Sequence, residues 1–316
     1  MSDIGPVLIL AGGLSPEREV SLRSGSRLQA VLRNAGVEAD IADADAALIR
    51  ALEAYTPAVV FPVLHGVGGE DGSLQQVLTL FGIPYVGATA DACRIAFDKP
   101  MAKAIATAAG VATPPSVTLP NEVFHSLGGA AVLGQIVRTL GLPMFVKPAC
   151  GGSAFGATQV QRAEELPAAM IACFEYCRTA LIERYVAGTE ISVSVIDTGS
   201  GPCALPAVEI CPRSGSYDYA ARYTAGHTEF HAPARLPGTV MAAAAAAATT
   251  LHQALGLRDL SRTDLIVSGD EVLFLEANVM PGLTETSTLP MAVASAGLDL
   301  GAVFRDLLAQ AADRGN

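Results

Sequence analysis

The side chains best suited to bind a metal ion follow a short apolar run at residues 273–275. That run predicts a buried strand, and because side chains alternate along a strand, Glu276 and Asn278 point to one face. Asp264, in a predicted neighbouring strand, could bring a second carboxylate to the same place. Two carboxylates and an amide oxygen, with no Cys or His beside them, suit Mg²⁺ better than zinc and predict a site for nucleotide phosphates. Solvated acids beside a polar turn would account for the same residues.

A glycine-rich segment with a lysine at its base indicates a second phosphate-binding element. The predicted strand at 143–148 contains Lys147, and glycines are frequent in the segment 149–156 that connects it to the next predicted strand. Flexible backbone N–H groups of such a hairpin can close over an anion while the lysine adds charge. The segment is not a P-loop, because no Gly-Lys-Ser/Thr follows and the next element is a strand. An ordinary glycine hairpin is the alternative interpretation.

The N-terminal elements predict a doubly wound α/β unit. A buried strand at 5–11 is followed by two glycines and by a helix that carries Glu17 near its start. Strand, glycine turn and helix open such a unit, and the N-terminus of the helix can hold an anion. The third glycine of a dinucleotide fingerprint is absent, so nicotinamide binding is not predicted. A later glycine-rich loop begins at His65, which could contact a ligand or anchor the loop.

The later elements place further candidate side chains. Glu183 and Glu190 flank a short hinge in a predicted hairpin, where they could grip an adenine and a ribose or remain exposed acids. Residues 214–230 lack periodicity, and a long polar loop inside a compact domain is usually functional, which draws attention to Arg222 and Tyr223. The other predicted elements are a short strand at 83–87, a helix at 92–109, an extended edge or linker at 113–120 and a buried helix at 237–255.

Composition limits the classes of function. The chain has 316 residues, which predicts two or three packed units, and its net charge of −11 argues against nucleic acid and anionic membrane as main partners. ATP needs only a local basic pocket. Six cysteines without a CxxC motif predict reduced thiols and a cytoplasmic location. No apolar run approaches the ~20 residues of a membrane span, and the N-terminus lacks the basic region of a signal peptide.

Taken in order, these motifs are similar to those of the D-alanine–D-alanine ligases, a family of the ATP-grasp superfamily. The similarity covers essentially the whole chain. The stretches that carry it are GGLSPEREVSLRSG (12–25), LHGVGGEDGSLQ (64–75), GIPYVGA (82–88), DKPMAK (98–103), FVKPACGGSAFG (145–156), LIERYVAGTEISV (181–193), YDYAARY (217–223), SRTD (261–264) and EANVMPGLTETSTLP (276–290).

The resemblance implies an α/β (α+β) protein with a three-domain ATP-grasp fold. The implied domains are an N-terminal doubly wound domain at 1–91, a central lid domain at 92–186 and a C-terminal catalytic domain at 187–316, with ATP between the last two. The implied reaction joins two D-alanines through a D-alanyl phosphate, for peptidoglycan precursors. It uses ATP as co-substrate and Mg²⁺ or Mn²⁺, two ions per site. The resemblance also implies a cytoplasmic homodimer.

The resemblance assigns roles to particular residues. Asp264, Glu276 and Asn278 match the metal ligands. The implied ATP contacts are Lys99, Lys147, Ser153, Glu183, Tyr185, Val186, Glu190 and Arg222. The implied substrate contacts are Glu17, His65, Arg262, Gly282, Ser287 and Thr288. Glu17, Ser153, Tyr223, Arg262 and Ser287 are implied to be catalytic: Glu17 holds the first ammonium group, and Arg262 binds the second carboxylate and stabilises the tetrahedral oxyanion.

The sequence departs from the family pattern at a few positions. Ala154 stands where a second serine is usual, Arg222 replaces a lysine, and Thr288 replaces a leucine or methionine beside the second substrate. These departures leave two alternatives open. One is a related ligase that takes D-lactate, D-serine or another second substrate, in resistance or secondary metabolism. The other is a non-catalytic homologue that binds nucleotide.

Overall fold

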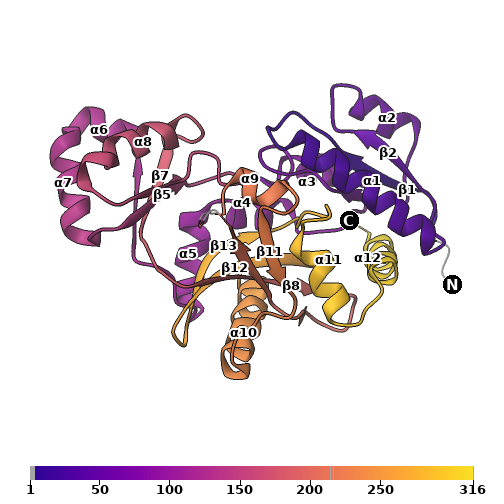
Figure 1. Ribbon diagram of the computed structural model, residues 1–316. Coiled ribbons are helices and arrows are strands. Elements are labelled where there is room, and N and C mark those ends of the chain that lie inside the picture. The colour runs from indigo at the N-terminus through magenta and orange to yellow at the C-terminus, as the bar shows by residue number, and fades with distance from the viewer. Residues whose placement is uncertain (1–3, 214, 216, 316) are drawn as a thin grey trace.

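Three β-sheets organise the chain in the computed structural model, which describes residues 4–213, 215 and 217–315. Helices and strands mix along the whole chain, which confirms the predicted α/β class. The N-terminal sheet and the second sheet lie on opposite sides of the molecule, and the third sheet lies between and below them (Figure 1). Each sheet draws its strands from one of the three segments 1–91, 92–186 and 187–316.

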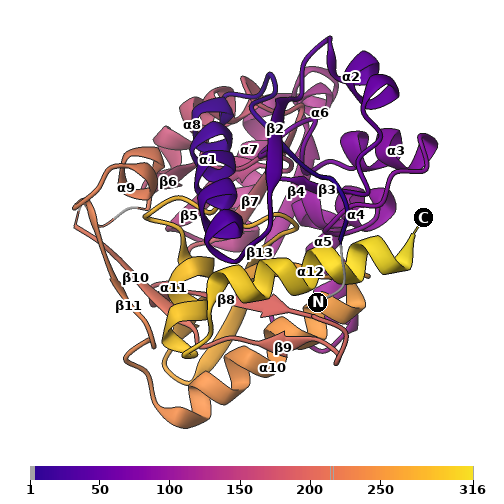
Figure 2. The same ribbon diagram turned by 90° about the vertical axis from the view of Figure 1, so that its right-hand side faces the viewer.

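The parallel sheet β2-β1-β3 is covered by helices on both faces, as predicted for a doubly wound unit. Val7, Ile9 and Ala11 of β1 share one core with α1 and α12, whereas Leu8 and Leu10 share another with α2 and α3. Figure 2 shows α12, from the end of the chain, running past this sheet beside α1. The bounds are β1 Val7–Ala11, β2 Ala39–Asp43, β3 Val59–Pro62, α1 Arg18–Asn34, α2 Leu48–Ala54, α3 Ser73–Leu80 and α12 Leu300–Arg314.

The second sheet, in the order β4-β7-β5-β6, carries the glycine-rich hairpin between β5 and β6. β4 is its edge strand, in line with the extended edge predicted at 113–120. Residues from α6, α7 and α8 complete a separate core on this sheet. The bounds are β4 Ser116–Pro120, α6 Asn121–Leu127, α7 Gly129–Leu140, β5 Met144–Pro148, β6 Thr158–Val160, η1 Ala163–Glu165, α8 Leu166–Phe174 and β7 Thr179–Arg184.

The third sheet, in the order β11-β10-β8-β12-β13 with β9 beside β8, has one apolar and one polar face. Ile191, Val193 and Val195 of β8 face the core formed with α4, α5 and α10, while Ser192 lies on the other face. The bounds are α4 Ala90–Phe97, α5 Lys99–Ala108, β8 Thr189–Ile196, β9 Cys203–Ala204, β10 Val208–Pro212, α9 Tyr219–Tyr223, β11 Thr228–His231, α10 Gly238–Ala254, β12 Leu260–Ser268, β13 Glu271–Asn278 and α11 Thr288–Ser295.

Three element predictions are wrong. The helix predicted at 92–109 is two helices, because Asp98 is extended and caps α5 by accepting a hydrogen bond from Met101 N (2.9 Å). The strand predicted at 83–87 is reduced to a single bridge to β3. The loop predicted at 214–230, of which residues 214 and 216 lie outside the described residues, contains α9 and β11, because Asp218 caps α9 and β11 pairs with β10.

Candidate active site

Strands β12 and β13 bring the predicted metal ligands together. Asp264 lies opposite Glu276 in the antiparallel register, and Arg262 lies opposite Asn278. The register shifts after Asp264, so that the next pair joins Leu265 to Phe274 in the core. Strict alternation would put side chains two apart on the same face, but this bulge lets Phe274 be buried while Glu276 faces the site. The sequence pattern did not predict the bulge.

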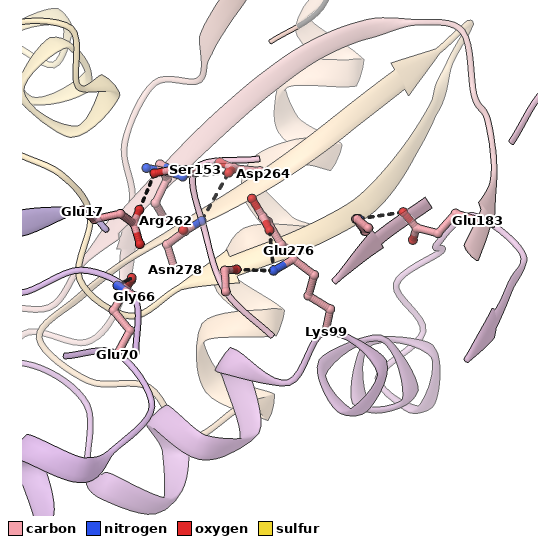
Figure 3. A network of polar contacts seen from close by, with 12 residues as sticks. Glu17, Gly66, Glu70, Lys99, Ser153, Glu183, Arg262, Asp264, Glu276 and Asn278 are labelled. Atoms are coloured by element: carbon pink, nitrogen blue, oxygen red, sulfur yellow. Dashed lines mark hydrogen bonds and ion pairs between the residues drawn. The ribbon is translucent and has the colours of Figure 1, made fainter. Parts of the chain in front are cut away.

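The two carboxylates lie among cations (Figure 3). Glu276 forms an ion pair with Lys99 (3.1 Å), and Asp264 accepts two hydrogen bonds from Arg262 (2.7 and 2.8 Å) and one from Asn278 (3.2 Å). Burial alone would raise the pKa of Glu276, but Lys99, Arg222 and other nearby cations outweigh it and lower that pKa to about 2. Glu276 is therefore ionised at neutral pH, as a metal ligand must be.

This donor set fits a magnesium ion that arrives with a phosphate. The described residues contain no group of three or more His, Cys, Asp and Glu side chains placed to hold a metal. Two carboxylates with one amide oxygen therefore make an incomplete shell. Mg²⁺ is commonly held in this way in nucleotide sites, by one or two carboxylates together with substrate phosphates and water.

Three buried charges form a second cluster beside the hairpin. Glu183 lies between Lys103 (2.5 Å) and Lys147 (2.6 Å). Burial opposes ionisation of Glu183, but the two lysines lower its pKa. Lys103 was not among the predicted site residues. Its spacing of four from Lys99 would have placed both lysines on one side of a helix, which is the signal that could have found it.

A cavity of about 450 Å³ opens between the second and third sheets. Its size suits a nucleotide, and its wall includes the glycine-rich hairpin with Ala154. Ser153 and Ala154 both adopt left-handed backbone conformations (φ 51° and 58°), which are unusual for residues other than glycine. Ser153 faces a smaller pocket, whereas the other predicted ATP contacts line the cavity: Lys99, Lys147, Glu183, Tyr185, Val186, Glu190 and Arg222.

The smaller pocket, of about 50 Å³, is lined by residues from segments that are far apart in the sequence. Ser153 donates a hydrogen bond to the Glu17 carboxylate and contacts the Tyr223 hydroxyl (2.7 Å). These contacts join Glu17, Ser153 and Tyr223 into one hydrogen-bonded group, and Figure 3 shows Ser153 beside Glu17. All six predicted substrate contacts also line this pocket, namely Glu17, His65, Arg262, Gly282, Ser287 and Thr288.

Hydroxyl groups and one glycine line the part of this pocket formed by residues 282–288. Ser192 donates a hydrogen bond to Thr288 (2.7 Å), so the wall at Thr288 is polar rather than apolar. A Cβ at Gly282 would lie 2.8 Å from Ser287 Oγ, so a side chain at this position would displace the Ser287 hydroxyl. Thr284 in turn contacts Ser287 (2.9 Å) and holds it in place.

A second carboxylate, Glu70, lies in the same pocket as Glu17 and was not predicted. Its Oε2 accepts a hydrogen bond from Gly66 N (2.8 Å). Burial, followed by the charge of Glu17, raises the pKa of Glu70 to about 8, and burial raises the pKa of Glu17 as well. Burial and the nearby Arg262 lower the pKa of His65 to about 4, so its ring is neutral at pH 7. Two acids and a neutral imidazole are therefore available beside Arg262.

Stacked aromatic rings tie the glycine-rich hairpin to α9. Phe155 packs against Tyr176 (ring centroids 5.6 Å apart) and against Tyr219 (5.0 Å), and Tyr219 packs against Tyr223 (4.9 Å). Phe155 and Tyr219 were not predicted as site residues, although both lie within the stretches that define the resemblance. We refer to Tyr176, Phe155, Tyr219 and Tyr223 below as the aromatic ladder.

A nucleotide-sized cavity between two antiparallel sheets, with buried lysines along it and two carboxylates at its end, defines the ATP-grasp class of ligases. Comparison with known proteins narrows the class. A family model described as "D-ala D-ala ligase C-terminus" matches residues 105–309, and "D-ala D-ala ligase N-terminus" matches residues 41–88. This chain belongs to the D-alanine–D-alanine ligase family.

Individual relatives agree over nearly the whole chain. The D-alanine–D-alanine ligase of Moorella thermoacetica is 37% identical over 97% of this chain and 98% of its own length. That of Anaeromyxobacter dehalogenans strain 2CP-1 is 40% identical over 92% of each chain. Among solved structures, the Bacillus anthracis D-alanine–D-alanine ligase has a TM-score of 0.81 at 27% identity, covering 98% of this chain and 97% of its own. The VanG D-Ala:D-Ser ligase of Enterococcus faecalis has a TM-score of 0.81 at 28% identity, covering 97% and 99%.

Proposed function

We propose that this protein is an ATP-dependent ligase that joins two D-alanines into D-alanyl-D-alanine. The observation that carries this proposal is the shared wall of the two pockets. Gly152, Tyr217, Arg222 and Asp264 line both the nucleotide-sized cavity and the smaller pocket that holds Glu17 and Arg262. A carboxylate bound in the smaller pocket can therefore meet the terminal phosphate of ATP bound in the cavity.

In the first step, the carboxylate of one D-alanine attacks the γ-phosphate of ATP and releases ADP. The buried lysines neutralise phosphate charge and fix its position, which is most of what phosphoryl transfer requires. Mg²⁺ held by Asp264, Glu276 and Asn278, as two ions, would add further neutralisation on the phosphates. Glu17, oriented by Ser153, holds the ammonium group of this D-alanine.

In the second step, the amine of another D-alanine attacks the carbonyl of the acyl phosphate, and phosphate leaves. Arg262 is aimed into the smaller pocket by its two hydrogen bonds to Asp264, where it can bind the second carboxylate and stabilise the oxyanion. An acyl phosphate is readily hydrolysed, so the hairpin, α9 and the aromatic ladder serve to exclude water.

D-Serine is a second candidate for the second substrate. The hydrogen bond between Ser192 and Thr288 gives the pocket a polar wall, which could accept the hydroxymethyl group of D-serine. A relative at 28% identity is a D-Ala:D-Ser ligase, which supports testing this candidate. Within the described residues, the paired hydroxyls are the feature that favours it.

The substrate is tested by mass analysis of the products formed from ATP, Mg²⁺ and D-alanine, alone and with D-serine or D-lactate. D-Alanyl-D-alanine from D-alanine alone is the expected result. Phosphate release only when D-alanine is combined with D-serine or D-lactate would indicate a related ligase with a different second substrate. Tight ATP binding without turnover on any of these substrates would favour a non-catalytic homologue.

The cellular setting belongs to the same proposal. D-Alanyl-D-alanine serves peptidoglycan precursors, and the ATP that it requires favours action in the cytoplasm. None of the six cysteines, all of them within the described part of the chain, is in a disulfide, which fits a reducing compartment. No helix among the described residues is long and apolar enough to cross a bilayer. We extend the proposal to a homodimer and to domains at 1–91, 92–186 and 187–316.

A further inference from the structure

The chain has only three lysines, and all of them lie at the candidate active site. They are Lys99 and Lys103 of α5 and Lys147 of β5, among 20 lysines and arginines in all. Lys99 pairs with Glu276, whereas Lys103 and Lys147 share Glu183. Lysine carries its charge on a compact ammonium group, which fits a narrow buried site better than the broad guanidinium group of arginine. Of the three, Lys103 is the one that does not line the nucleotide-sized cavity.

Lys103 reaches Glu183 from behind the cavity wall. Its ammonium group donates to Glu183 Oε1 (2.5 Å) and to the hydroxyl of Thr113. The other oxygen of Glu183, Oε2, pairs with Lys147 (2.6 Å). The side chains of Lys103 and Glu183 are only 5% and 4% exposed, so water screens their interaction weakly. Each of the two lysines therefore holds one oxygen of a single buried carboxylate.

The members of this cluster come from two different units of the fold. β5 and β7 pair so that Lys147 and Glu183 are diagonal neighbours on one face of the second sheet, and both line the cavity. Lys103 belongs to α5, which packs beside β13 of the third sheet (Figure 1). The ion pair between Lys103 and Glu183 therefore links the sheet that carries the glycine-rich hairpin to the unit that carries Glu276.

The balance of charges in this cluster decides how much positive charge faces the cavity. Two lysines and one glutamate leave one positive charge over. Because Lys103 takes one oxygen of Glu183, that carboxylate neutralises only part of the charge on Lys147. Without Lys103, Glu183 and Lys147 would form a neutral pair, and a phosphate would compete with Glu183 for the same ammonium group. Such competition is strong between buried groups, where little water screens the charges.

We propose that Lys103 is a positioning residue for nucleotide binding. It binds Glu183 and thereby leaves Lys147 able to neutralise the phosphates of ATP. It also holds β7 against α5, so that the cavity wall keeps its place relative to Glu276. Lys103 acts through Glu183 and does not touch the nucleotide itself. The inference rests on the proposed function, because it requires that the cavity binds ATP.

Nucleotide affinity is measured by calorimetry with ADP and Mg²⁺ on the full-length protein, without D-alanine. Lys103→Met is expected to weaken ADP binding at least about tenfold, a usual size of coupling within one salt-bridge network. Lys103→Gln, which can still donate to Glu183 but carries no charge, should show a similar loss and provides the test if Lys103→Met does not fold. The matched control is Arg138→Met, which removes an exposed positive charge from α7. A loss for Lys103→Gln no larger than that for Arg138→Met would overturn the proposal.

A double variant tests whether Lys103 acts through Glu183. In a Glu183→Gln background, adding Lys103→Met should change ADP affinity by less than about threefold, because the carboxylate that Lys103 holds is then uncharged. A loss as large as the one that Lys103→Met causes alone would show that Lys103 acts on the nucleotide by another route, and would overturn its positioning role.

The small number of lysines allows a readout that does not depend on nucleotide. Protein labelled with carbon-13 lysine should give three lysine side-chain signals by NMR, one each for Lys99, Lys103 and Lys147. Lys103→Gln should shift the Lys147 signal more than the Lys99 signal, because Glu183 then falls to Lys147 alone. An unchanged Lys147 signal would contradict the shared carboxylate on which the proposal depends.

Turnover separates this role from a general loss of structure. The KM of Lys103→Gln for ATP should rise at least about tenfold, whereas its KM for D-alanine should stay within about twofold of the unsubstituted value. An equal rise in both constants would show that Lys103 only stabilises the fold, and would overturn the proposal. If the unsubstituted protein binds ADP but releases no phosphate from ATP with D-alanine, the proposed ligase function fails while the binding test of Lys103 still decides its role.

Discussion

At the scale of single residues, burial and neighbouring charges together hold similar acids of one site in different protonation states. Glu276 lies among cations and has a pKa of about 2, although it is buried. Glu70 lies beside another carboxylate, and burial with that charge raises its pKa to about 8. Burial raises the pKa of Glu190, on the cavity wall, to about 7. Residue type alone therefore does not decide which acid can bind a cation and which can carry a proton.

Substitution of Glu70 by Gln should change how stability depends on pH. A carboxyl group with a raised pKa in the folded state stabilises the protein fully below its unfolded pKa of about 4.5, and this contribution is lost as the pH rises towards about 8. Without ligands, Glu70→Gln should therefore gain more than about 1 kcal/mol relative to the unsubstituted protein between pH 5 and pH 8.5. Urea unfolding at several pH values measures this. The control is Glu53→Gln, which changes an exposed acid. A stability difference between Glu70→Gln and the unsubstituted protein that does not vary with pH would contradict the account.

Glu276→Gln should lower turnover by roughly a hundredfold or more while the protein remains folded, because loss of a metal ligand removes several kcal/mol of charge stabilisation. The matched control is Glu271→Gln, which changes an exposed acid on the same strand. ATP-dependent phosphate release at saturating D-alanine and Mg²⁺ compares the two variants. Near-normal activity of Glu276→Gln would refute the role of this carboxylate in binding the metal.

Site residues could be predicted from the sequence where they follow strand alternation or lie within the motifs of the family. Strand alternation placed Glu276 and Asn278 on one face, and the resemblance supplied Glu17, Ser153 and Tyr223, which do meet. Glu70 escaped prediction because its importance comes from burial beside charges that are distant in sequence. Lys103 has a local signal in its spacing of four from Lys99, but its partner Glu183 lies 80 residues away in the sequence. No local pattern distinguishes a buried acid in a glycine-rich loop from an exposed one.

At the scale of elements, two departures from regular backbone geometry orient side chains toward the site. The bulge in β13 sends Phe274 into the core and Glu276 into the cavity, so one strand serves both. The left-handed backbone at Ser153 and Ala154 bends the hairpin over the smaller pocket, where Ser153 reaches Glu17 and Tyr223. The aromatic ladder then joins the hairpin to α9. Positioning here depends on contacts between elements that are tens of residues apart.

Phe155→Ala should separate phosphate release from dipeptide formation. Phe155 connects Tyr176 to Tyr219, so its removal should loosen the cover over the site and let water hydrolyse the acyl phosphate. The expected result is more phosphate released per dipeptide formed, with dipeptide formation slowed about tenfold. Phe81→Ala, at a partly exposed ring in the N-terminal unit, is the control. A phosphate-to-dipeptide ratio that stays at one in Phe155→Ala would remove the aromatic ladder from this role.

Most elements follow from the sequence, and the exceptions have physical causes. Buried strands such as β1 were predicted because each residue of the run is apolar. The break between α4 and α5 escaped because Asp98 continues a helical pattern and only its capping hydrogen bond shows that the helix ends. α9 is too short to show a helical pattern in the sequence. β11 forms by pairing with β10, so its own residues do not show a strong strand pattern.

At the scale of the whole molecule, the last helix belongs to the core of the first sheet. Phe304 of α12 packs edge-on against Phe61 of β3, with ring centroids 5.5 Å apart. The core around them also includes Leu289 and Val293 of α11, which follow the loop that contains Gly282 and Ser287. Helix α12 is therefore packed against the N-terminal sheet, and the N-terminal unit, in which Glu17 precedes α1, is fixed relative to the strands that carry Asp264 and Glu276.

Phe304→Ala should lower the free energy of unfolding by about 3–5 kcal/mol, the usual cost of truncating a buried phenylalanine. The loss should also weaken D-alanine binding, because Glu17 would no longer be held against Ser153. Denaturant unfolding and substrate kinetics measure the two effects. Leu298→Ala, at a half-exposed side chain between α11 and α12, should change neither by a comparable amount. A loss below about 1 kcal/mol for Phe304→Ala would show that this contact does not hold the two parts together.

The measurement that tests the central claim most directly follows an oxygen atom. D-Alanine labelled with oxygen-18 in its carboxylate is incubated with ATP, Mg²⁺ and the full-length protein, and the released phosphate and the dipeptide are analysed by mass. Ligation through a D-alanyl phosphate predicts one labelled oxygen in each phosphate and one phosphate per D-alanyl-D-alanine. Unlabelled phosphate, or phosphate without dipeptide, would contradict the account.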